Sequence, residues 1–310
     1  MRMKTTISQQ TSKMQMLLNI QDYMTKVIRG ETTLSPDNVD LFVEDCKKAV
    51  IGQLGGRERK YRIRMSGLGK PLCQQVCDKH GIEETMQYNS IMRFLYGDIT
   101  EAVMMLVMRE AGIDIVDYQR EVELDLDGHH ITGTLDVIIR DGAGVEKVWD
   151  IKSASDWAFK NKFTGFGGYE AMKTDDPFGY IMQGFLYSEA VGMPFGGWIV
   201  VNKSSGEVAV VETYDWTGED KDKYLADAKK RVKFLSDPDV AMFRPYTDEF
   251  ETYKRKGEVI RTGNKVLPKE CGLCGYKTHC WPNAVVHPRV TSQAKSPPMV
   301  WYSRLKTREI

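Results

Sequence analysis

The chain has 310 residues, of which 42% are hydrophobic and 28% are charged, and its 43 basic side chains balance its 43 acidic ones. This composition is that of an ordinary folded protein, and the zero formal net charge argues against a protein that coats nucleic acid non-specifically, although it does not exclude a local basic groove. Since no apolar run approaches the roughly 18–20 residues that a bilayer span needs, and the N-terminus lacks the apolar stretch of a secretory signal, we expect an intracellular protein that does not enter a membrane.

The N-terminal part of the chain predicts helices. Residues 1–30 are polar and Met-rich, which indicates a helix or a loosely packed arm. Ser35, followed by proline, predicts the N-cap of a second helix, whose apolar positions recur at helical spacing up to Gly55. The stretch Arg57–Arg64 holds five positive charges in eight residues and is either a solvated charge run or a DNA contact. We expect residues 1–64 to form an N-terminal helical region.

Two further helices are expected after this region. A short one follows Met65 and carries Cys73 and Cys77, which are four residues apart and therefore share a helical face. Residues 88–112 predict the clearest helix of the chain, with Gly112 as its stop. The apolar positions expected to face the core are Ile91, Phe94, Leu95, Ile99, Val103, Leu106 and Val107.

The same long helix also carries a polar stripe. Arg93, Gly97 and Glu101 are spaced four apart, so they lie along one line of the helix. A glycine between the two charged residues removes side-chain bulk and leaves room for another group to approach the backbone.

Three neighbouring strands are expected next, over residues 119–126, 130–140 and 145–153, with Asp127-Gly128 as a tight turn between the first two. Asp136 lies on the second strand, and Asp150 and Lys152 lie on the third, where alternate side chains point to the same face. Carboxylates on apolar strands are costly to bury without a partner. These three residues alone therefore indicate either a salt-bridged structural cluster or a site for a hard cation.

The remaining segments give signals of unequal clarity. Residues 154–177 lack a regular period and interleave aromatic and lysine side chains, which suits a loop that contacts nucleic acid or a plain surface loop. Pro177 precedes a helix on which Gln183 and Tyr187 lie four apart, on one face. We expect a hairpin over 196–214, an amphipathic helix over 220–235 and an irregular tail over 284–310, whereas the charged segment 244–261 gives no clear pattern.

The cysteines form a second constellation. In an intracellular chain, their clustered use indicates metal binding rather than disulfides. Cys46 lies on an apolar helical stripe and is expected to be core filler. The spacing Cys271-x2-Cys274-x5-Cys280, together with one cysteine from the N-terminal part, can close a soft four-ligand site. The spacing alone favours a structural zinc over an iron–sulfur cluster.

The order E…GTLD…DIK…QGFLY resembles the PD-(D/E)XK nucleases, and among them the RecB-like exonucleases. The resemblance implies an α/β fold with a restriction-endonuclease-like core, in which helices flank a mixed central sheet, over residues 65–240. It also implies roles for individual residues. Glu101, where many members have His, would hold Mg²⁺ or Mn²⁺ together with Asp136, Asp150 and the backbone carbonyl of Ile151, Lys152 would be the catalytic lysine, and Gln183, Tyr187 and Arg93 would support the site or the DNA.

Some RecB-like nucleases, including AddB-type and CRISPR-associated members, combine an upstream cysteine with a C-terminal C-x2-C-x5-C motif. The resemblance therefore implies a 4Fe-4S cluster that joins the N- and C-terminal segments, with residues 241–310 as the C-terminal cysteine-cluster segment and tail. The implied ligands are Cys73, Cys271, Cys274 and Cys280, with Cys77 as the fallback for Cys73 and His279 as a further substitute. Structural Zn²⁺ is the alternative cofactor.

Together these features predict a metal-dependent deoxyribonuclease that acts as an exonuclease on single-stranded DNA or DNA ends, in recombination, repair or the processing of phage or mobile-element DNA. The sequence has no glycine-rich phosphate loop, so any unwinding would come from a separate helicase or a recombinase partner. Two alternatives stay open: a non-catalytic nucleic-acid-binding protein on the same fold, and a zinc-stabilised enzyme of other chemistry.

Overall fold

The computed structural model describes residues 2–56, 61–85, 88–165, 167–213 and 216–306. The chain divides into two compact units. The first, here called the sheet unit, comprises Met1–Gly69 and Gln87–Ser236. The second, the cysteine unit, comprises Lys70–Met86 and Asp237–Ile310.

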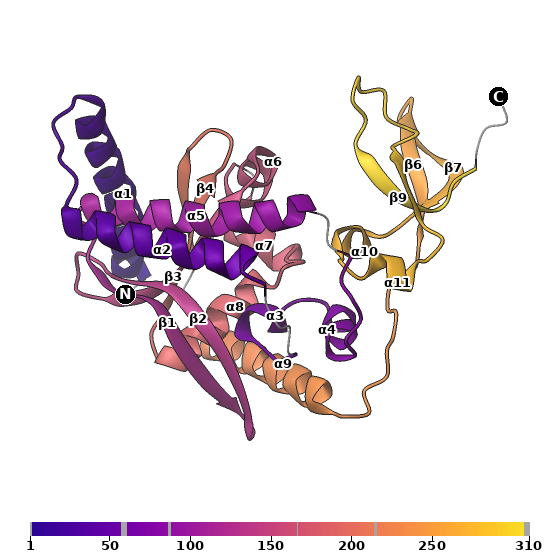
Figure 1. Ribbon diagram of the computed structural model, residues 1–310, viewed down its shortest axis with the longest axis horizontal. Coiled ribbons are helices and arrows are strands. Elements are labelled where there is room, and N and C mark those ends of the chain that lie inside the picture. Colours follow the sequence, from indigo (N-terminus) through magenta and orange to yellow (C-terminus); the bar gives the residue numbers. More distant parts are fainter. Residues whose placement is uncertain (1, 57–60, 86–87, 166, 214–215, 307–310) are drawn as a thin grey trace. The chain divides into compact units, whose positions relative to one another are not determined.

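The sheet unit is built on a five-stranded mixed sheet (Figure 1). Its strands, in the order in which they are hydrogen-bonded, are β1 (Ile115–Leu126), β2 (His129–Arg140), β3 (Glu146–Ala154), β4 (Phe195–Asn202) and β5 (Val208–Glu212). Neighbouring strands are antiparallel except β3 and β4, which are parallel. The expected mixed α/β architecture and the expected three-stranded meander are therefore confirmed.

Local sequence explains how the meander forms. Asp127 and Gly128 both have positive φ, 56° and 85°, and Leu126 pairs with His129 across them. A two-residue turn of this kind follows the twist of antiparallel strands, and Asp-Gly is well suited to it. The parallel β3–β4 pair needs a long crossover instead, and residues 155–194 supply it.

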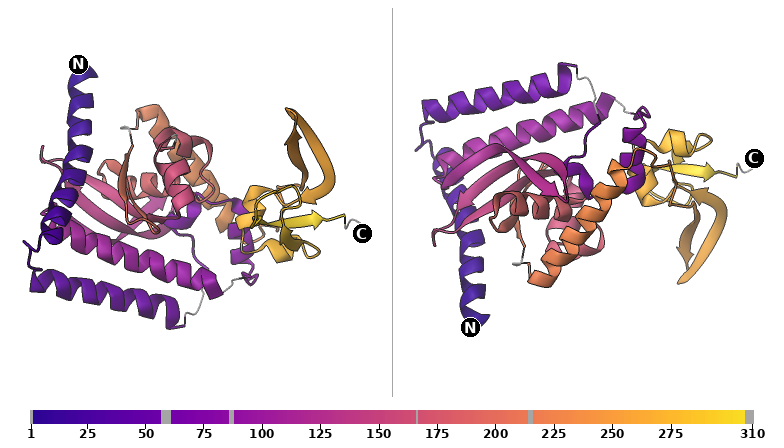
Figure 2. Two further views of the ribbon diagram at one scale, coloured as in Figure 1. Left: turned by 90° about the horizontal axis from the view of Figure 1, so that it is seen from above. Right: turned by 90° about the horizontal axis from the view of Figure 1, so that it is seen from below.

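Helices cover both faces of this sheet (Figures 1 and 2). The helices α2 (Pro36–Leu54) and α5 (Tyr88–Glu110) lie on one side, and α8 (Tyr180–Val191) and α9 (Gly218–Ser236) lie on the other. The shorter α3 (Met65–Leu68) contacts α8, and α1 (Arg2–Ile28) contacts α5 and β5. Among the described residues, no helix combines the length and the hydrophobicity that a bilayer span requires.

Helix α5 buries a different set of residues from the expected one. Its buried side chains are Ala102, Met104, Met105 and Met108, and the three methionines pack with apolar residues of β2, β3 and β4. The expectation that Phe94 and Val103 face the core was wrong, because they are 52% and 44% exposed. Only the C-terminal half of this long helix lies over apolar strand residues, so helical spacing alone could not locate its buried face.

The crossover between β3 and β4 is more ordered than expected. The described part of this crossover contains the short helix α6 (Asp156–Ala158), the π-helix η1 (Phe159–Phe163) and α7 (Tyr169–Thr174). The hydroxyl of Ser155 accepts a hydrogen bond from the backbone N–H of Ala158, which caps the first of these turns.

The cysteine unit contains a second sheet, in a region where the sequence indicated no strands. The antiparallel strands β6 (Glu249–Arg255), β7 (Glu258–Val266), β9 (Met299–Arg304) and β8 (Val285–Pro288) are paired in that order. The expectation of an irregular tail was therefore wrong. The interior of this sheet is polar, since Glu251 is 1% exposed and accepts hydrogen bonds from Asn264, Thr262 and Tyr302 at 2.9, 3.0 and 2.7 Å. A polar interior removes the hydrophobic alternation from which strands are predicted.

The division into units differs from the expected boundaries after residues 64 and 240. Helices α1 and α2 belong to the sheet unit, where Gln53 and Asn38 donate hydrogen bonds to Asp98 and Glu110 of α5. The helix α4 (Leu72–Lys79) belongs instead to the cysteine unit, together with α10 (Lys269–Leu273) and α11 (Lys277–Cys280). The cysteine unit is thus made of two chain segments that lie far apart in the sequence.

Candidate functional site

Three elements of the sheet unit supply the acidic residues of the candidate active site. Glu101 lies on α5, Asp136 on β2, and Asp150 and Lys152 on β3. The β2–β3 register pairs Val137 with Trp149, so the next position along places Asp136 beside Asp150. The pKa values of Glu101, Asp136 and Lys152 are each shifted by charges of other members of this group, so the structure brings together the residues that the sequence motifs singled out.

Asp150 is the most contacted of these carboxylates. Its side chain is 1% exposed, and the Lys152 Nζ atom lies 2.8 Å from Oδ1 and 2.7 Å from Oδ2. Only the Oδ1 contact has hydrogen-bond geometry, so the buried Oδ2 atom accepts no hydrogen bond from any described residue. Gln183 Nε2 also donates to Oδ1, at 3.2 Å. One oxygen of a buried carboxylate thus keeps acceptor capacity, as a cation ligand requires.

The two other acids are held by neighbouring backbone and amide groups. Asp136 Oδ2 accepts a hydrogen bond from the backbone N–H of Ile151 at 2.7 Å, which places the Ile151 peptide beside the acids. Glu101 Oε1 accepts a hydrogen bond from the side chain of Gln119. Gln119 has a φ of 49°, a left-handed conformation that is rare for residues other than glycine. The sequence analysis missed Gln119, because neither a motif nor a period marks it.

The protonation of the site reflects crowded negative charge. Burial raises the pKa of Glu101 from its ordinary 4.5 to about 7, against the attraction of Lys152 and with the repulsion of Asp150 and Asp98. Burial also raises the pKa of Asp136 far above its usual range, with further contributions from Glu101 and Asp150. Burial disfavours the charge on Lys152, but Asp150 and Asp136 outweigh it and raise the pKa of the lysine. The site therefore keeps a protonated lysine and has too little positive charge for three ionised carboxylates.

Gln183 and Tyr187 face the same group from α8. Gln183 Nε2 lies 3.3 Å from the hydroxyl oxygen of Tyr187 as well as next to Asp150. The Tyr187 ring packs against Gly133, where an added Cβ atom would come within 2.6 Å of Tyr187 Cε1. Gly133 in the GTLD motif is therefore required by the close approach of a tyrosine that supports the site.

Some of the expected DNA-contacting residues lie outside this group. Arg93 is exposed on α5 and donates to the backbone oxygen and the Oδ1 atom of Asn89, at 3.1 and 3.2 Å. Gly97 lies in between and does leave room, since an added Cβ atom would meet only Ser153 Oγ, at 3.6 Å. Within the basic stretch Arg57–Arg64, residues 57–60 lie outside the described part of the chain.

A groove of about 430 Å³, lined in part by α2 and α5, reaches Glu101. Its lining includes Glu101, Gln119 and Thr134. Asp45 and Lys48 of α2 contribute charges of both signs farther along. The groove gives solvent, and hence a cation, a route to Glu101.

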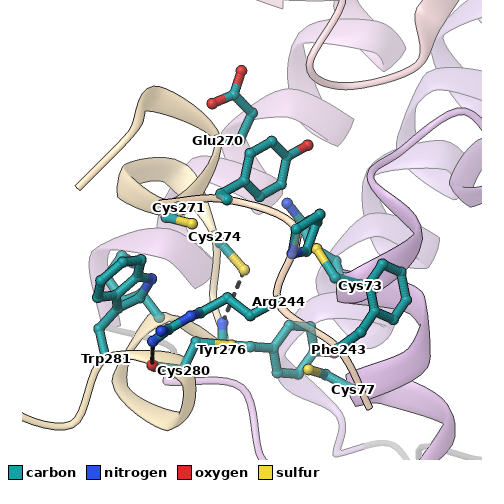
Figure 3. Close-up of a pocket in the computed structure, with 14 residues that line it drawn as sticks. Cys73, Cys77, Phe243, Arg244, Glu270, Cys271, Cys274, Tyr276, Cys280 and Trp281 are labelled. Carbon is teal, nitrogen blue, oxygen red and sulfur yellow. Dashed lines mark hydrogen bonds between the residues drawn. The ribbon is translucent and has the colours of Figure 1, made fainter. Parts of the chain in front are cut away.

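Five of the six cysteines line one cavity in the cysteine unit (Figure 3). They are Cys73 and Cys77 of α4, Cys271 of α10, Cys274 just after it, and Cys280 of α11. The sixth cysteine lies on α2 of the sheet unit, where Cys46 is half-buried. His279 is exposed and does not line the cavity.

The cavity gathers thiols in a largely apolar setting. Burial, together with smaller contributions from nearby cysteines, raises the pKa of Cys73 to about 11 and that of Cys77 to about 12. The backbone N–H of Tyr276 donates to Cys274 Sγ at 3.3 Å. Burial also raises the pKa of Cys271, and the nearby indole N–H of Trp281 partly offsets this increase. This N–H makes no hydrogen bond of ordinary geometry to a described residue. N–H groups directed at sulfur are features of sites that bind soft metals.

Neither site has the geometry of a closed metal centre. Among the described residues, no group of three or more His, Cys, Asp or Glu side chains is arranged to hold a metal ion. The donor chemistry fits a hard cation at the acids and a soft metal or cluster at the thiols. Binding at either site would require its side chains to move closer to the bound group.

Comparisons with known proteins add little to this description. No protein-family model matches the chain, and no curated protein is similar to it. A solved structure described as the crystal structure of SSO0001 has 16% sequence identity and a TM-score of 0.39, and the match covers 63% of this chain and 87% of that one.

Proposed function

We propose that this chain is a metal-dependent deoxyribonuclease of the PD-(D/E)XK type, similar to the RecB-like exonucleases, which hydrolyses phosphodiester bonds at DNA ends with a preference for single strands. One observation carries the proposal: three carboxylates from α5, β2 and β3 lie beside one half-buried lysine. A structural salt bridge needs one acid for one lysine, whereas this group holds three acids, two of which have raised pKa values. Such an excess of acid is typical of cation sites.

The residues take distinct roles in this reaction. Glu101, Asp136, Asp150 and the carbonyl of Ile151 would hold Mg²⁺ or Mn²⁺, which supplies Lewis-acid activation of the phosphodiester and of a water molecule. Lys152 keeps its proton, because its pKa is raised, and it therefore acts by donating to the negatively charged oxygens on phosphorus rather than by removing a proton. Gln183 orients Asp150, and Tyr187 supports Gln183.

The cysteine cavity fits a structural cofactor in the same proposal. Cys73, Cys271, Cys274 and Cys280, with Cys77 as the substitute for Cys73, would hold a 4Fe-4S cluster, and structural Zn²⁺ is the alternative. In the cavity, this cofactor would fasten Lys70–Met86 to the C-terminal segment. A chain of this kind would act in DNA recombination or repair, with strand separation supplied by a separate helicase.

The decisive test is degradation of end-labelled single-stranded DNA in Mg²⁺ or Mn²⁺. The wild-type protein is expected to release nucleotides from the ends, and Lys152→Ala and Asp150→Asn are each expected to lower the rate by about 100-fold or more. Lys47→Ala, an exposed lysine of α2, is the control and should retain full activity. Metal-loaded wild-type protein that binds DNA but leaves every end intact would instead support the non-catalytic alternative. Comparing strands labelled at the 5′ end with strands labelled at the 3′ end gives the polarity of digestion.

A further inference from the structure

Three aromatic rings form a row beside the candidate catalytic lysine. The Tyr180 ring centroid lies 5.0 Å from Lys152 Nζ. The Phe163 ring stacks on Tyr180 at a centroid distance of 6.4 Å and an interplanar angle of 29°. The Phe178 ring also stacks on Tyr180, at a centroid distance of 5.6 Å and an interplanar angle of 26°. Tyr180 therefore contacts both phenylalanine rings and the lysine.

Exposure increases along the row. Phe163 is 8% exposed, Tyr180 is half-buried, and Phe178 is 40% exposed. The inner two rings are therefore packed in the protein, whereas the outer ring presents apolar surface to solvent close to a charged site. From the two spacings, the Phe178 centroid lies within about 11 Å of Lys152 Nζ.

The backbone that carries the outer two rings is firmly held. Both oxygens of Asp176 accept hydrogen bonds at 2.9 Å from backbone N–H groups, one from Tyr180 and one from Ile181. Gly179 has a φ of 74°, and an added Cβ atom there would come within 2.4 Å of the Gly69 backbone. Phe178 is thus presented on a fixed turn at the start of α8, and a ligand would not have to order this turn on binding.

We propose that Phe178 is a stacking platform for one base of a single-stranded DNA substrate, with Tyr180 as the packed ring that links this platform to Lys152. The inference rests on the proposed nuclease function and specifies how that site recognises its substrate. A nucleotide combines a flat aromatic base, which can stack on Phe178, with a phosphate a short distance away, which can meet Lys152. Bases within a duplex have both faces covered by their neighbours, so the platform selects unpaired bases and thereby accounts for a single-strand preference.

The first experiment measures binding without cleavage. The Kd of the full chain for a fluorescently labelled single-stranded oligonucleotide is measured by anisotropy in EDTA. Phe178→Ala is expected to raise the Kd about tenfold, and Phe178→Trp is expected to leave it near the wild-type value. Phe234→Ala is the matched control, because Phe234 of α9 is 37% exposed, and it should not change the Kd. Phe178→Leu keeps apolar bulk without a π-face and should behave like Phe178→Ala.

The second experiment locates the stacked base. A 2-aminopurine moved along the strand is expected to be quenched at one position in the wild-type complex but not in the Phe178→Ala complex. An abasic nucleotide at that position should weaken wild-type binding about tenfold and leave Phe178→Ala binding unchanged, because the two changes remove the same contact. A Phe178→Ala Kd within twofold of wild type, or an abasic penalty that persists in this variant, would overturn the platform. Because neither readout needs cleavage, a failure of the proposed nuclease activity remains distinguishable.

Discussion

Asp150 and its neighbours illustrate how individual residues divide the charge of the site. Lys152 contacts both oxygens of Asp150, whereas no described residue forms an ion pair with Glu101 or Asp136, and both of these acids have raised pKa values. The fold therefore holds these two acids in an arrangement that favours their neutral forms. This has a consequence for stability that can be measured without substrate.

The metal-free sheet unit is expected to lose stability as the pH rises. The folded-state pKa of Glu101, about 7, lies above its ordinary 4.5, so the folded state binds this proton more tightly than the unfolded state does. The resulting stabilisation is fully present below about pH 4.5 and is lost as the pH rises through 7, and Asp136 acts in the same direction. Urea unfolding in EDTA from pH 5 to 8, followed by tryptophan fluorescence, measures this loss of unfolding free energy.

Glu101→Gln provides the control for this pH dependence. The variant should show a smaller loss of unfolding free energy over the same pH range, because one of the two titrating acids is gone. Mn²⁺ should raise the stability of the wild type more at pH 8 than at pH 5, when more carboxylates are ionised. Equal slopes for wild type and Glu101→Gln would show that Glu101 titrates normally.

Gly133→Ala tests the close approach of Tyr187. The added Cβ atom would lie 2.6 Å from Tyr187 Cε1 and 3.1 Å from Met65 Cβ, so the tyrosine ring must move. We expect a loss of about 1–3 kcal/mol in unfolding free energy, together with reduced DNA cleavage. Gly142→Ala is the control, since an added Cβ atom there meets nothing described within 4 Å, and it should leave both quantities unchanged.

At the scale of elements, the predictable parts are those with an apolar period or a sharp turn. The meander β1–β3 could be predicted because apolar residues fill its strands and Asp127-Gly128 marks its first turn. The strands β6 and β7 could not, because Glu251 and Asn264 occupy interior positions where a hydrophobic residue would be expected. The same limit applies to the site: motif spacing identified Asp136 and Asp150, but Gln119 and Phe178 are placed by the tertiary fold.

The polar interior of the second sheet leads to a prediction of its own. Burial alone would raise the pKa of Glu251, but its hydrogen bonds from Asn264, Tyr302 and Thr262 outweigh burial and lower the pKa. This stabilisation is present above the ordinary value of 4.5 and is lost as the pH falls through the lowered folded-state value. Glu251→Ala leaves those donors without their acceptor and should cost about 3 kcal/mol.

Hydrogen exchange of the β6, β7 and β9 amides measures this change within the cysteine unit. The substitution should speed exchange there and leave the amides of β2 and β3 in the sheet unit unaffected. Glu258→Ala, at an exposed position of β7, is the control. Unchanged protection in Glu251→Ala would mean that the network contributes little to the stability of the sheet.

At the scale of the whole molecule, the cysteine cavity predicts the metal content. Protein purified without oxygen should contain iron and sulfide and show thiolate-to-iron absorption. Cys271→Ser should abolish this absorption, whereas Cys46→Ser, in the sheet unit, should not. Comparison of Cys73→Ser with Cys77→Ser identifies the fourth ligand, since both side chains line the cavity. Colourless protein that contains zinc and no iron would contradict the cluster and favour the zinc alternative.

The composition of the cysteine unit from Lys70–Met86 and Asp237–Ile310 also affects how the protein is made. A ribosome delivers Cys73 and Cys77 early, but the thiols that complete their cavity emerge only after the entire sheet unit has been synthesised. Until then the early helix lacks its packing partners, and closing so long a segment costs chain entropy. Nascent chains that stall before Cys271 should therefore leave the thiols of Cys73 and Cys77 accessible to alkylation, and these should become protected only after Cys271, Cys274 and Cys280 have left the ribosome.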